Sequence, residues 1–389
     1  MRVAHLCRDF SPLSETFIYD YVTALDARGA EGHVITMNVH DRPDRPFPRV
    51  YHAPWPGQRH PSYLLHRGLA AAGVGHPRRA RWPELRRRVT ALLREVRPDV
   101  VHAHYGTTGA FLLPAAQRLG IPAVVSFHGR DAFSTTATDH YREPYQYVFE
   151  NAAAITAVSH LMADHLVCEG AYPSRVEVVR VGKRADDYPF RLRKGSVREW
   201  VFVGRLTTKK DPLGALAAFA DVARDHPDQR LRMIGDGPLS DDVARAVRDL
   251  GLDESVDIAG PLPHDETRAA MDHADALLLP SKTAPSGDRE GVPTVLMEAA
   301  FLGLPAVSTT HSGIPEVVPE QNQWLLAPEG DLDAVAGRMR ALINAPDETR
   351  ATVARAAREK VEAEFDLDVA ADHLLRLYEA VIYGAKRGR

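Results

Sequence analysis

Hydrophobic residues along the chain form two kinds of pattern that alternate with each other. Short apolar runs, which predict buried strands, are followed by longer segments with the three- and four-residue spacing of a helix. In the first half of the chain the predicted strands cover residues 2–7, 33–37, 98–104, 121–129, 155–160 and 175–182, and the predicted helices cover 15–29 and 109–120. Strands that alternate with helices in this way predict a parallel sheet with helices on both faces.

The alternation stops between residues 183 and 198, where the chain is polar and contains glycine and proline, as is typical of a linker. It starts again with predicted strands at 199–206, 231–237, 256–260, 276–281 and 305–308, and predicted helices at 211–226 and 293–303. We therefore expect an α/β protein with two doubly wound, Rossmann-like domains. Their predicted bounds are 1–182 and 199–370, with a linker at 183–198.

The last predicted helix, residues 371–389, has a clear apolar stripe. The stripe consists of Leu374, Leu375, Leu377, Tyr378 and Val381. An amphipathic helix must bury such a face against another element. We expect this helix to return to the N-terminal domain.

Composition narrows the class of protein. A chain of 389 residues, 44% hydrophobic and 26% charged, is long enough for two globular domains. A net charge of -4 does not favour nucleic acid as a partner. Two cysteines, Cys7 and Cys168, allow no disulfide framework and no cysteine-based zinc site. The N-terminus lacks the apolar core of a signal peptide, and no stretch approaches the roughly 20 apolar residues of a membrane span. We expect a soluble, cytoplasmic protein.

Candidate binding residues follow the predicted strands of the second domain, because ligands of doubly wound sheets bind beyond the carboxyl ends of the strands. Gly204, Arg205 and Lys210 follow the strand at 199–203, and two cations near a helix start suit a diphosphate. A solvated turn is the alternative. Gly235 and Gly237 follow the next strand and permit close approach of a ligand, although taken by themselves they are better explained by a plain strand-to-helix turn. Neither loop has a complete dinucleotide-binding glycine pattern.

The most informative stretch is residues 287–308, with the sequence GDREGVPTVLMEAAFLGLPAVS. Pro293 is expected to begin a helix, which leaves the N–H groups of its first turn free to bind a ligand. Glu290 lies in the loop before this helix, and Glu298 lies in its second turn among apolar residues. A carboxylate accepts two hydrogen bonds from neighbouring hydroxyls, so this pair predicts a sugar or ribose ligand. Ordinary helix-end electrostatics would be the structural alternative.

Several motifs, in the same order along the chain, resemble those of the retaining GT-B glycosyltransferases of family 4. The segment 290–318, EGVPTVLMEAAFLGLPAVSTTHSGIPEVV, is similar to the family's defining segment, with its two glutamates eight positions apart. The stretches VFVGRLTTKKDP and MIGDGPL match its phosphate-binding and glycine-rich segments, and SETF, VHAHYG and SFHGRD match its first domain. The forms GDREGVP, SETF and HSGIPE are similar to the branch that builds bacterial exopolysaccharides, of the colanic-acid type.

The resemblance implies a GT-B fold, in which two Rossmann-like domains face each other across a cleft, and a hexosyltransferase activity. It implies that Arg205 and Lys210 bind the diphosphate of a nucleotide-sugar, that Glu298 binds the ribose and that Glu290 contacts the donor sugar. It further implies donor-site positions at Gly204, Gly235, Gly237, Gly291, Val292, Pro293 and Thr294, with Leu262 near the base. The chain departs from the family at Asp211, where relatives often have glycine, and at 181–188 near the hinge.

Histidines of the first domain are further candidates. The resemblance implies that His128, in SFHGRD, acts near the donor sugar and the acceptor. His102 and His104 alternate along a predicted strand and could suggest a metal, but no third ligand is evident in the sequence, so a structural or acceptor-side role is the better interpretation. The resemblance implies no cofactor and no metal, because Arg205 and Lys210 supply the positive charge.

Possible partners include a membrane. The segment 76–88, HPRRARWPELRRR, contains six arginines and one acidic residue, and we expect either a peripheral anionic membrane contact through Arg78–Arg88 or a solvated basic face. The expected donor is a UDP- or GDP-sugar, and the expected acceptor is a glycan, a lipid-linked sugar or a small molecule. The alternatives are a nucleotide-sugar epimerase or hydrolase of the same fold and, in a different class, a Rossmann oxidoreductase. A sugar-nucleotide sensor without catalytic activity is a further alternative.

Overall fold

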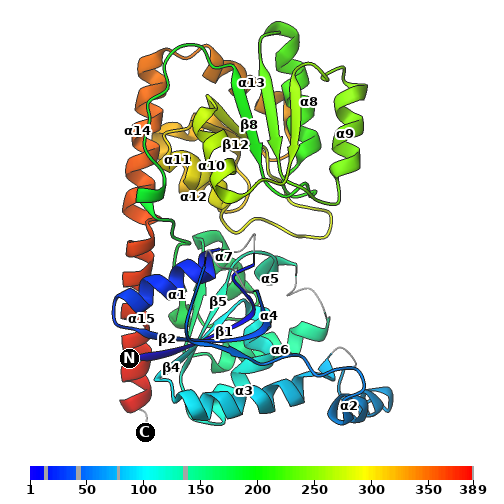
Figure 1. Ribbon diagram of the computed structural model, residues 1–389, viewed down its shortest axis with the longest axis vertical. Coiled ribbons are helices and arrows are strands. Elements are labelled where there is room, and N and C mark those ends of the chain that lie inside the picture. The colour runs from blue at the N-terminus through cyan, green and yellow to red at the C-terminus, as the bar shows by residue number, and fades with distance from the viewer. Residues whose placement is uncertain (13–15, 41–44, 77–78, 135–138, 388–389) are drawn as a thin grey trace. The chain divides into compact units, whose positions relative to one another are not determined.

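The computed structural model describes residues 1–12, 16–40, 45–76, 79–134 and 139–387 (Figure 1). The chain forms two compact units, the first made of Met1–Gly182 with Leu367–Arg389 and the second of Lys183–Asp366. Each unit contains its own parallel sheet with helices packed around it. The alternating pattern of the sequence therefore produces the α/β architecture that it predicts, twice in one chain.

The sheet of unit 1 has seven strands in the order β3-β2-β1-β4-β5-β6-β7. Val3 of β1 pairs with Gly32 of β2 on one side and with Val100 of β4 on the other, so the strand order reverses between β1 and β4. The strands are β1 (Arg2–Phe10), β2 (Glu31–Val39), β3 (Val50–His52), β4 (Val100–His104), β5 (Ala123–Phe127), β6 (Ala154–Ala157) and β7 (Val176–Val178).

Helices connect these strands. They are α1 (Phe17–Ala27), α2 (Pro61–Ala71), α3 (Trp82–Val96), α4 (Gly106–Gln117), α5 (Arg130–Phe133), α6 (Asp139–Asn151) and α7 (His160–Cys168), with a short 3-10 helix at Pro173–Arg175. Strand β4 and strand β5 are buried along their whole length, as expected for central strands covered on both faces.

The sheet of unit 2 has six strands in the order β10-β9-β8-β11-β12-β13, and the order reverses between β8 and β11. The strands are β8 (Glu199–Val203), β9 (Arg230–Ile234), β10 (Val256–Gly260), β11 (Ala276–Leu279), β12 (Ala306–Thr309) and β13 (Leu326–Ala327). The helices are α8 (Pro212–Asp225), α9 (Ser240–Asp249), α10 (His264–His273), α11 (Thr294–Phe301), α12 (Ile314–Val317), α13 (Leu332–Ile343) and α14 (Asp347–Glu364), with 3-10 helices at Ala185–Asp187 and Glu320–Leu325.

The last helix, α15 (Leu367–Arg387), belongs to unit 1 although it follows unit 2 in the sequence. Leu374, Leu377 and Tyr378 of its apolar stripe are buried in one cluster with Val3 and Val100 of the sheet. Leu375 and Val381 pack against the same cluster and are partly buried. The expected return of the C-terminal helix is confirmed, because the core of unit 1 is completed by this segment.

Residues 183–198, which we expected to link the domains, lie within unit 2. Arg193 anchors this stretch, because its buried guanidinium donates hydrogen bonds to the carbonyls of Arg191, Met271, Asp272, Ala274 and Leu302. Burial lowers the pKa of Arg193 to about 10. The carbonyls at the ends of α10 and α11 lack partners within their helices, so one arginine satisfies both helix ends.

No helix in the described part of the chain combines the length and the apolar character that a membrane span requires.

We predict that Arg193→Met destabilises the protein by about 3 kcal/mol, because several buried carbonyls lose their donor at once. For a unit of this size, that loss lowers the Tm by about 10 °C, which calorimetry measures. Arg191→Met is the matched control, because the Arg191 side chain is half exposed and its variant should change the Tm by only about 2 °C. An equal Tm for the two variants would contradict the anchoring role of Arg193.

Candidate functional site

The reversal of strand order in unit 2 places two loops side by side at the carboxyl ends of β8 and β11. Open parallel sheets bind their ligands at such a point. The loop after β8 carries Arg205 and Lys210, and the loop after β11 carries Glu290. Lys282 joins the two loops, because its backbone N–H donates to the carbonyl of Lys209 at 2.8 Å. The fold thus brings together three residues that are up to 85 positions apart in the sequence.

Glycines allow the loops after β8 and β9 to pack backbone against backbone. Gly235 has a φ of 138°, and a Cβ at this position would lie 2.0 Å from the carbonyl oxygen of Gly204. A Cβ on Gly237 would lie 2.5 Å from the carbonyl oxygen of Leu206. The stem of Lys210 runs over Gly204, with 3.3 Å between a built Cβ and the lysine Cδ. Of the four glycines predicted as donor-binding residues, Gly235 and Gly237 are therefore also required by the packing of these loops, whereas an added Cβ at Gly204 would meet only the lysine stem.

Asp211 explains one departure from the family pattern. Its φ of 50° lies in the left-handed region that glycine favours, and Asp is one of the few other residues that adopt it readily. Its carboxylate accepts from the N–H of Gly214 in the first turn of α8 and forms an ion pair with Lys282 at 2.9 Å. An aspartate here keeps the backbone turn and adds a helix cap.

Lys210 and Glu290 form an ion pair at the centre of the site, with 2.9 Å between Nζ and Oε1. Both side chains are largely buried. Burial acts to raise the pKa of Glu290, but the charges of Lys210 and Lys209 lower it more, so its pKa lies below the usual value and the carboxylate is ionised at neutral pH. Arg205 is exposed, and its side chain has no partner among the described residues. One cation is therefore paired with the carboxylate, and the other is open to a ligand.

Glu298 lies on α11, and its carboxylate is buried as its apolar neighbours predict. The helix begins at Thr294, one residue later than expected, with Pro293 as its N-cap and no side chain capping its first turn. Gly291 and Val292 are buried just before it. Lys183 lies 3.5 Å from the Glu298 carboxylate and is itself buried, a contact that the sequence did not reveal because Lys183 is 115 positions away.

Three further residues near Glu290 were missed by sequence reasoning. His311 and Ser312, which follow β12, contact the backbone of Glu290, and Glu329 contacts His311. The motif HSGIPE drew attention to this segment, but nothing in it indicates which residue it contacts. Leu262 follows β10 and lines a hollow of about 540 Å³ with Trp200 and His273.

His128 belongs to unit 1 and follows β5. The carboxylate of Asp131 accepts hydrogen bonds from the N–H groups of Gly106, His128 and Gly129, and so fixes this turn. Burial lowers the pKa of His128 to about 3, and neither ring nitrogen has a hydrogen-bond partner among the described residues. Its neutral ring packs against Phe17. The first two residues of the SETF motif, Ser14 and Glu15, lie outside the described residues.

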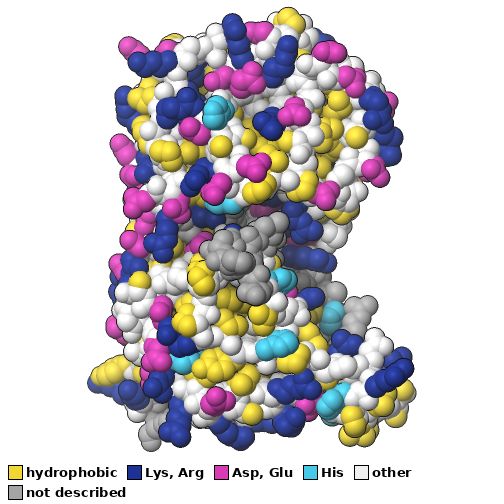
Figure 2. Space-filling model, in the orientation of Figure 1, with side chains coloured by type: hydrophobic (Ala, Val, Ile, Leu, Met, Phe, Trp, Pro, Cys, Tyr) yellow, Lys and Arg dark blue, Asp and Glu magenta, His cyan; other side chains and the backbone are white. Residues whose placement is uncertain are grey.

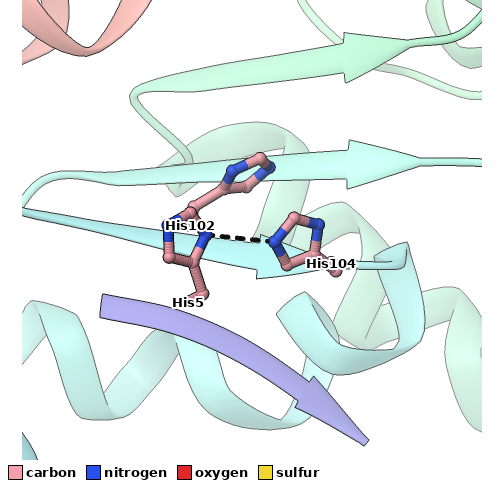
Figure 3. Close-up of side chains that lie close together, drawn as sticks. All are labelled: His5, His102 and His104. Carbon is pink, nitrogen blue, oxygen red and sulfur yellow. Dashed lines mark hydrogen bonds between the residues drawn. The ribbon is translucent and has the colours of Figure 1, made fainter. Parts of the chain in front are cut away.

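The fold adds a third imidazole to His102 and His104. His5 of β1 lies beside the two histidines of β4, and its Nδ1 is 3.2 Å from Nε2 of His104 (Figure 3). Burial lowers the pKa of His5 to about 3 and those of His102 and His104 well below the usual value, so all three rings are neutral.

Two hydroxyl groups are hydrogen-bond partners of His102. Nδ1 of His102 lies 2.6 Å from the Tyr378 hydroxyl, and its Nε2 lies 2.6 Å from the Ser126 hydroxyl. Both ring nitrogens of His102 thus have hydroxyl partners, and this ring connects the sheet to α15. The sequence showed no third ligand beside His102 and His104, and this interpretation was wrong, because β1 pairs with β4 and brings His5 next to them.

Two family models match the chain. Residues 186–360 match "Glycosyl transferases group 1", and residues 14–182 match "Glycosyl transferase 4-like domain". The chain is also similar over almost its whole length to WcaL of Escherichia coli K12, a glycosyltransferase named for colanic acid biosynthesis, with 30% identity covering 98% of this chain and 100% of the relative. The chain belongs to the family 4 glycosyltransferases.

Other members of the family agree with this assignment. The amylovoran biosynthesis glycosyltransferase AmsK of Erwinia amylovora is 32% identical over 72% of this glycosyltransferase and 70% of its own length. Among solved structures, HepE of Anabaena in complex with UDP-glucose has a TM-score of 0.76 and 18% identity, and the match covers 98% of this chain and 100% of that one. The fold is therefore GT-B, and the protein is homologous to enzymes of exopolysaccharide biosynthesis.

We predict that Lys210 and Glu290 of this glycosyltransferase are energetically coupled. A double-mutant cycle with Lys210→Met and Glu290→Gln, measured by urea unfolding, should give a coupling of about 2 kcal/mol at pH 7. Because the folded-state pKa of Glu290 is lowered, this contribution is complete above the unfolded value of about 4.3 and is lost as the pH falls through the folded value. Additive effects at pH 7, or a coupling that disappears between pH 8 and 6, would contradict the ion pair.

Proposed function

We propose that the protein transfers a hexose from a nucleotide-diphosphate sugar to a hydroxyl acceptor, with retention of the anomeric configuration and without a metal ion. The observation that best supports this proposal is the Lys210–Glu290 ion pair. It lies beside the exposed Arg205, where the strand order of unit 2 reverses. The cations suit the diphosphate, and the carboxylate suits the hydroxyls of the sugar.

In the proposed reaction, negative charge grows on the diphosphate as the glycosidic bond breaks. Arg205 and Lys210 would stabilise this charge, which is the electrostatic contribution that dominates many enzymes. The acceptor hydroxyl would attack from the same face, and the departing phosphate would take its proton. His128 of unit 1, neutral because its burial lowers its pKa to about 3, would contact hydroxyls and would not carry charge.

The proposed donor is a UDP-sugar, with a GDP-sugar as the second candidate. HepE, which shares the fold, was crystallised with UDP, with UDP and glucose and with UDP-glucose. The relatives named for colanic acid and amylovoran biosynthesis favour an exopolysaccharide or another cell-surface glycan as product. The chain is also similar to a protein named 2-deoxystreptamine glucosyltransferase, so a glycosylated small molecule is an alternative product. Thermal-shift screening against UDP-, GDP-, ADP- and dTDP-sugars distinguishes the donors, and product analysis with and without an acceptor separates transfer from hydrolysis.

We predict distinct kinetic effects for the two ends of the donor. Arg205→Ala should lower kcat roughly 100-fold, because its charge acts on the leaving diphosphate. Glu298→Gln should raise the KM for the donor roughly tenfold, the cost of one charged hydrogen bond to ribose, while keeping a polar group beside the buried Lys183.

Arg198→Ala is the matched control for Arg205→Ala. Arg198 precedes β8, whereas Arg205 follows it, so the two arginines lie at opposite ends of one strand. The control variant should keep wild-type kinetics within about twofold. Wild-type values for both Arg205→Ala and Glu298→Gln would contradict the proposed site.

We also propose a peripheral contact with anionic lipid, but at a different place from the arginine-rich segment. Trp82 is 5% exposed, and Arg79, Arg86 and Arg88 donate to backbone carbonyls of unit 1. Arg78 lies outside the described residues. Most of this segment, for which we expected either a membrane contact or a solvated basic face, is therefore used in internal contacts.

The neighbouring helix α2 is better suited to lipid. None of its residues is buried, and Leu64, Leu65 and Leu69 are 55%, 60% and 40% exposed. The sequence from residue 56 to 83 contains no acidic residue, and Figure 2 shows apolar and basic side chains together over α2. An exposed apolar face with basic neighbours is the pattern of an interfacial helix.

We predict that the protein co-sediments with phosphatidylglycerol vesicles and not with phosphatidylcholine vesicles. Leu64→Asp with Leu65→Asp should weaken this binding at least tenfold, because each leucine contributes about 1.5–3 kcal/mol when buried in lipid. Leu250→Asp, at an exposed leucine of unit 2, is the control and should bind as the wild type does. The proposed lipid contact is wrong if the Leu64→Asp, Leu65→Asp variant binds the vesicles as tightly as the wild type, or if the wild type fails to sediment with them.

A further inference from the structure

Two consecutive residues in the loop after β12, His311 and Ser312, contact both backbone polar groups of Glu290. The N–H of Glu290 donates to Nε2 of His311 at 3.1 Å, and the carbonyl of Glu290 accepts from the Ser312 hydroxyl at 2.6 Å. The residue that they grip carries the carboxylate at the centre of the site.

His311 is fixed in turn by Glu329. Its Nδ1 lies 2.8 Å from the Glu329 carboxylate, which also accepts from the N–H of Thr283 at 2.6 Å. Burial acts to raise the pKa of Glu329, but the hydrogen bonds from Thr283 and His311 lower it further, so this carboxylate is a charged acceptor. A ring that donates through Nδ1 to a carboxylate and accepts through Nε2 from an amide can have only one neutral tautomer. His311 is 1% exposed, so its orientation is set by these contacts and not by water.

Ser312 occupies a backbone conformation that serine does not favour. Its φ is 51°, in the left-handed region, which costs a non-glycine residue about 1–2 kcal/mol. Gly313, which would adopt this conformation freely, stands one position later. Strain of this kind persists where a side chain is needed at the strained position, and here the hydroxyl bonded to Glu290 supplies that need.

We propose that His311 and Ser312 form a clamp on the Glu290 peptide that fixes the direction of its carboxylate and so selects the orientation of the donor sugar. His311 is a positioning residue in this proposal, because it acts through Glu290 and does not touch the substrate. The proposal rests on the proposed function, in which Glu290 contacts sugar hydroxyls.

The clamp has a physical purpose at this position. The Glu290 side chain is held on one side by Lys210, and a displacement of about 1 Å in a site of this kind can cost a factor of about 100. Fixing both the N–H and the carbonyl leaves only the side-chain torsions to be set by Lys210 and the sugar. A rigid supporting shell is what holds a binding group in its productive geometry.

Two substitutions of His311 separate its two hydrogen bonds. Glutamine can place its amide oxygen where Nε2 lies, so His311→Gln keeps the acceptor for the Glu290 N–H. Asparagine reaches only to the position of Nδ1, so His311→Asn keeps the bond to Glu329 and loses the bond to Glu290. We expect hydrogen exchange at the Glu290 amide to be slow in the wild type and in His311→Gln, and at least tenfold faster in His311→Asn.

Ligand affinity tests the consequence for the sugar. By calorimetry, His311→Asn should bind UDP-glucose at least tenfold more weakly than the wild type and bind UDP within twofold of it, whereas His311→Gln should stay within threefold for both. If the donor screen selects a GDP-sugar, GDP-mannose and GDP take their place. A loss of UDP and UDP-glucose affinity together, or equal behaviour of the Asn and Gln variants, would overturn the clamp.

Ser312→Ala has a matched control on the same strand–loop segment. Ser308→Ala removes a hydroxyl that donates to the carbonyl of Leu279 at the same 2.6 Å distance and does not contact Glu290. Ser312→Ala should weaken UDP-glucose binding about fivefold and leave UDP binding unchanged. Ser308→Ala should leave both affinities unchanged. If the ratio of UDP-glucose affinity to UDP affinity is the same in the two serine variants, the clamp is wrong.

Glu290→Gln distinguishes the two levels of the proposal. If this variant keeps wild-type preference for UDP-glucose over UDP, the sugar contact of Glu290 is wrong and the proposed function of this residue fails. If Glu290→Gln loses the preference and His311→Asn keeps it, the sugar contact holds and the clamp alone is wrong.

Discussion

The ion pair between Lys210 and Glu290 is the interaction on which the candidate site depends. It joins the two loops that leave the sheet of unit 2 where the strand order reverses, and it lies largely out of water. A buried carboxylate is costly unless a cation compensates it, so each loop fixes the other. The proposed donor would offer a diphosphate to the cation and hydroxyls to the carboxylate, so each partner of the pair would gain a group of matching charge or hydrogen-bonding capacity.

Much of the surrounding structure serves to hold these loops. Glycines at 235 and 237 let neighbouring loops pack without side chains between them, and Asp211 adopts a turn that glycine would otherwise take. His311 and Ser312 reach the Glu290 backbone from the next strand. The arrangement is therefore a rigid frame of backbone contacts around a small number of charged side chains, which is suited to electrostatic stabilisation with little reorganisation.

Elsewhere in each unit, a buried polar side chain connects elements of the fold through hydrogen bonds. In unit 1, His102 connects the central strands to Tyr378 of the returning helix α15, and in unit 2 Arg193 satisfies the carbonyls of two helix ends. Both side chains are polar, and Arg193 lies in the stretch that the sequence predicted to be a linker. They can be buried because both ring nitrogens of His102 and each guanidinium nitrogen of Arg193 form hydrogen bonds with residues that are distant in the chain.

The sequence by itself determined the two α/β sheets, the return of the amphipathic C-terminal helix and the glycosyltransferase family, because these follow from local periodicity and from contiguous motifs. It did not determine the short strands β3 and β13, whose three and two residues carry no period. Only the tertiary structure decided that Lys183 meets Glu298, that His5 joins His102 and His104, and that His311 meets Glu290. These contacts link residues 21 to 115 positions apart, and strand order, which no local pattern records, determines which loops become neighbours.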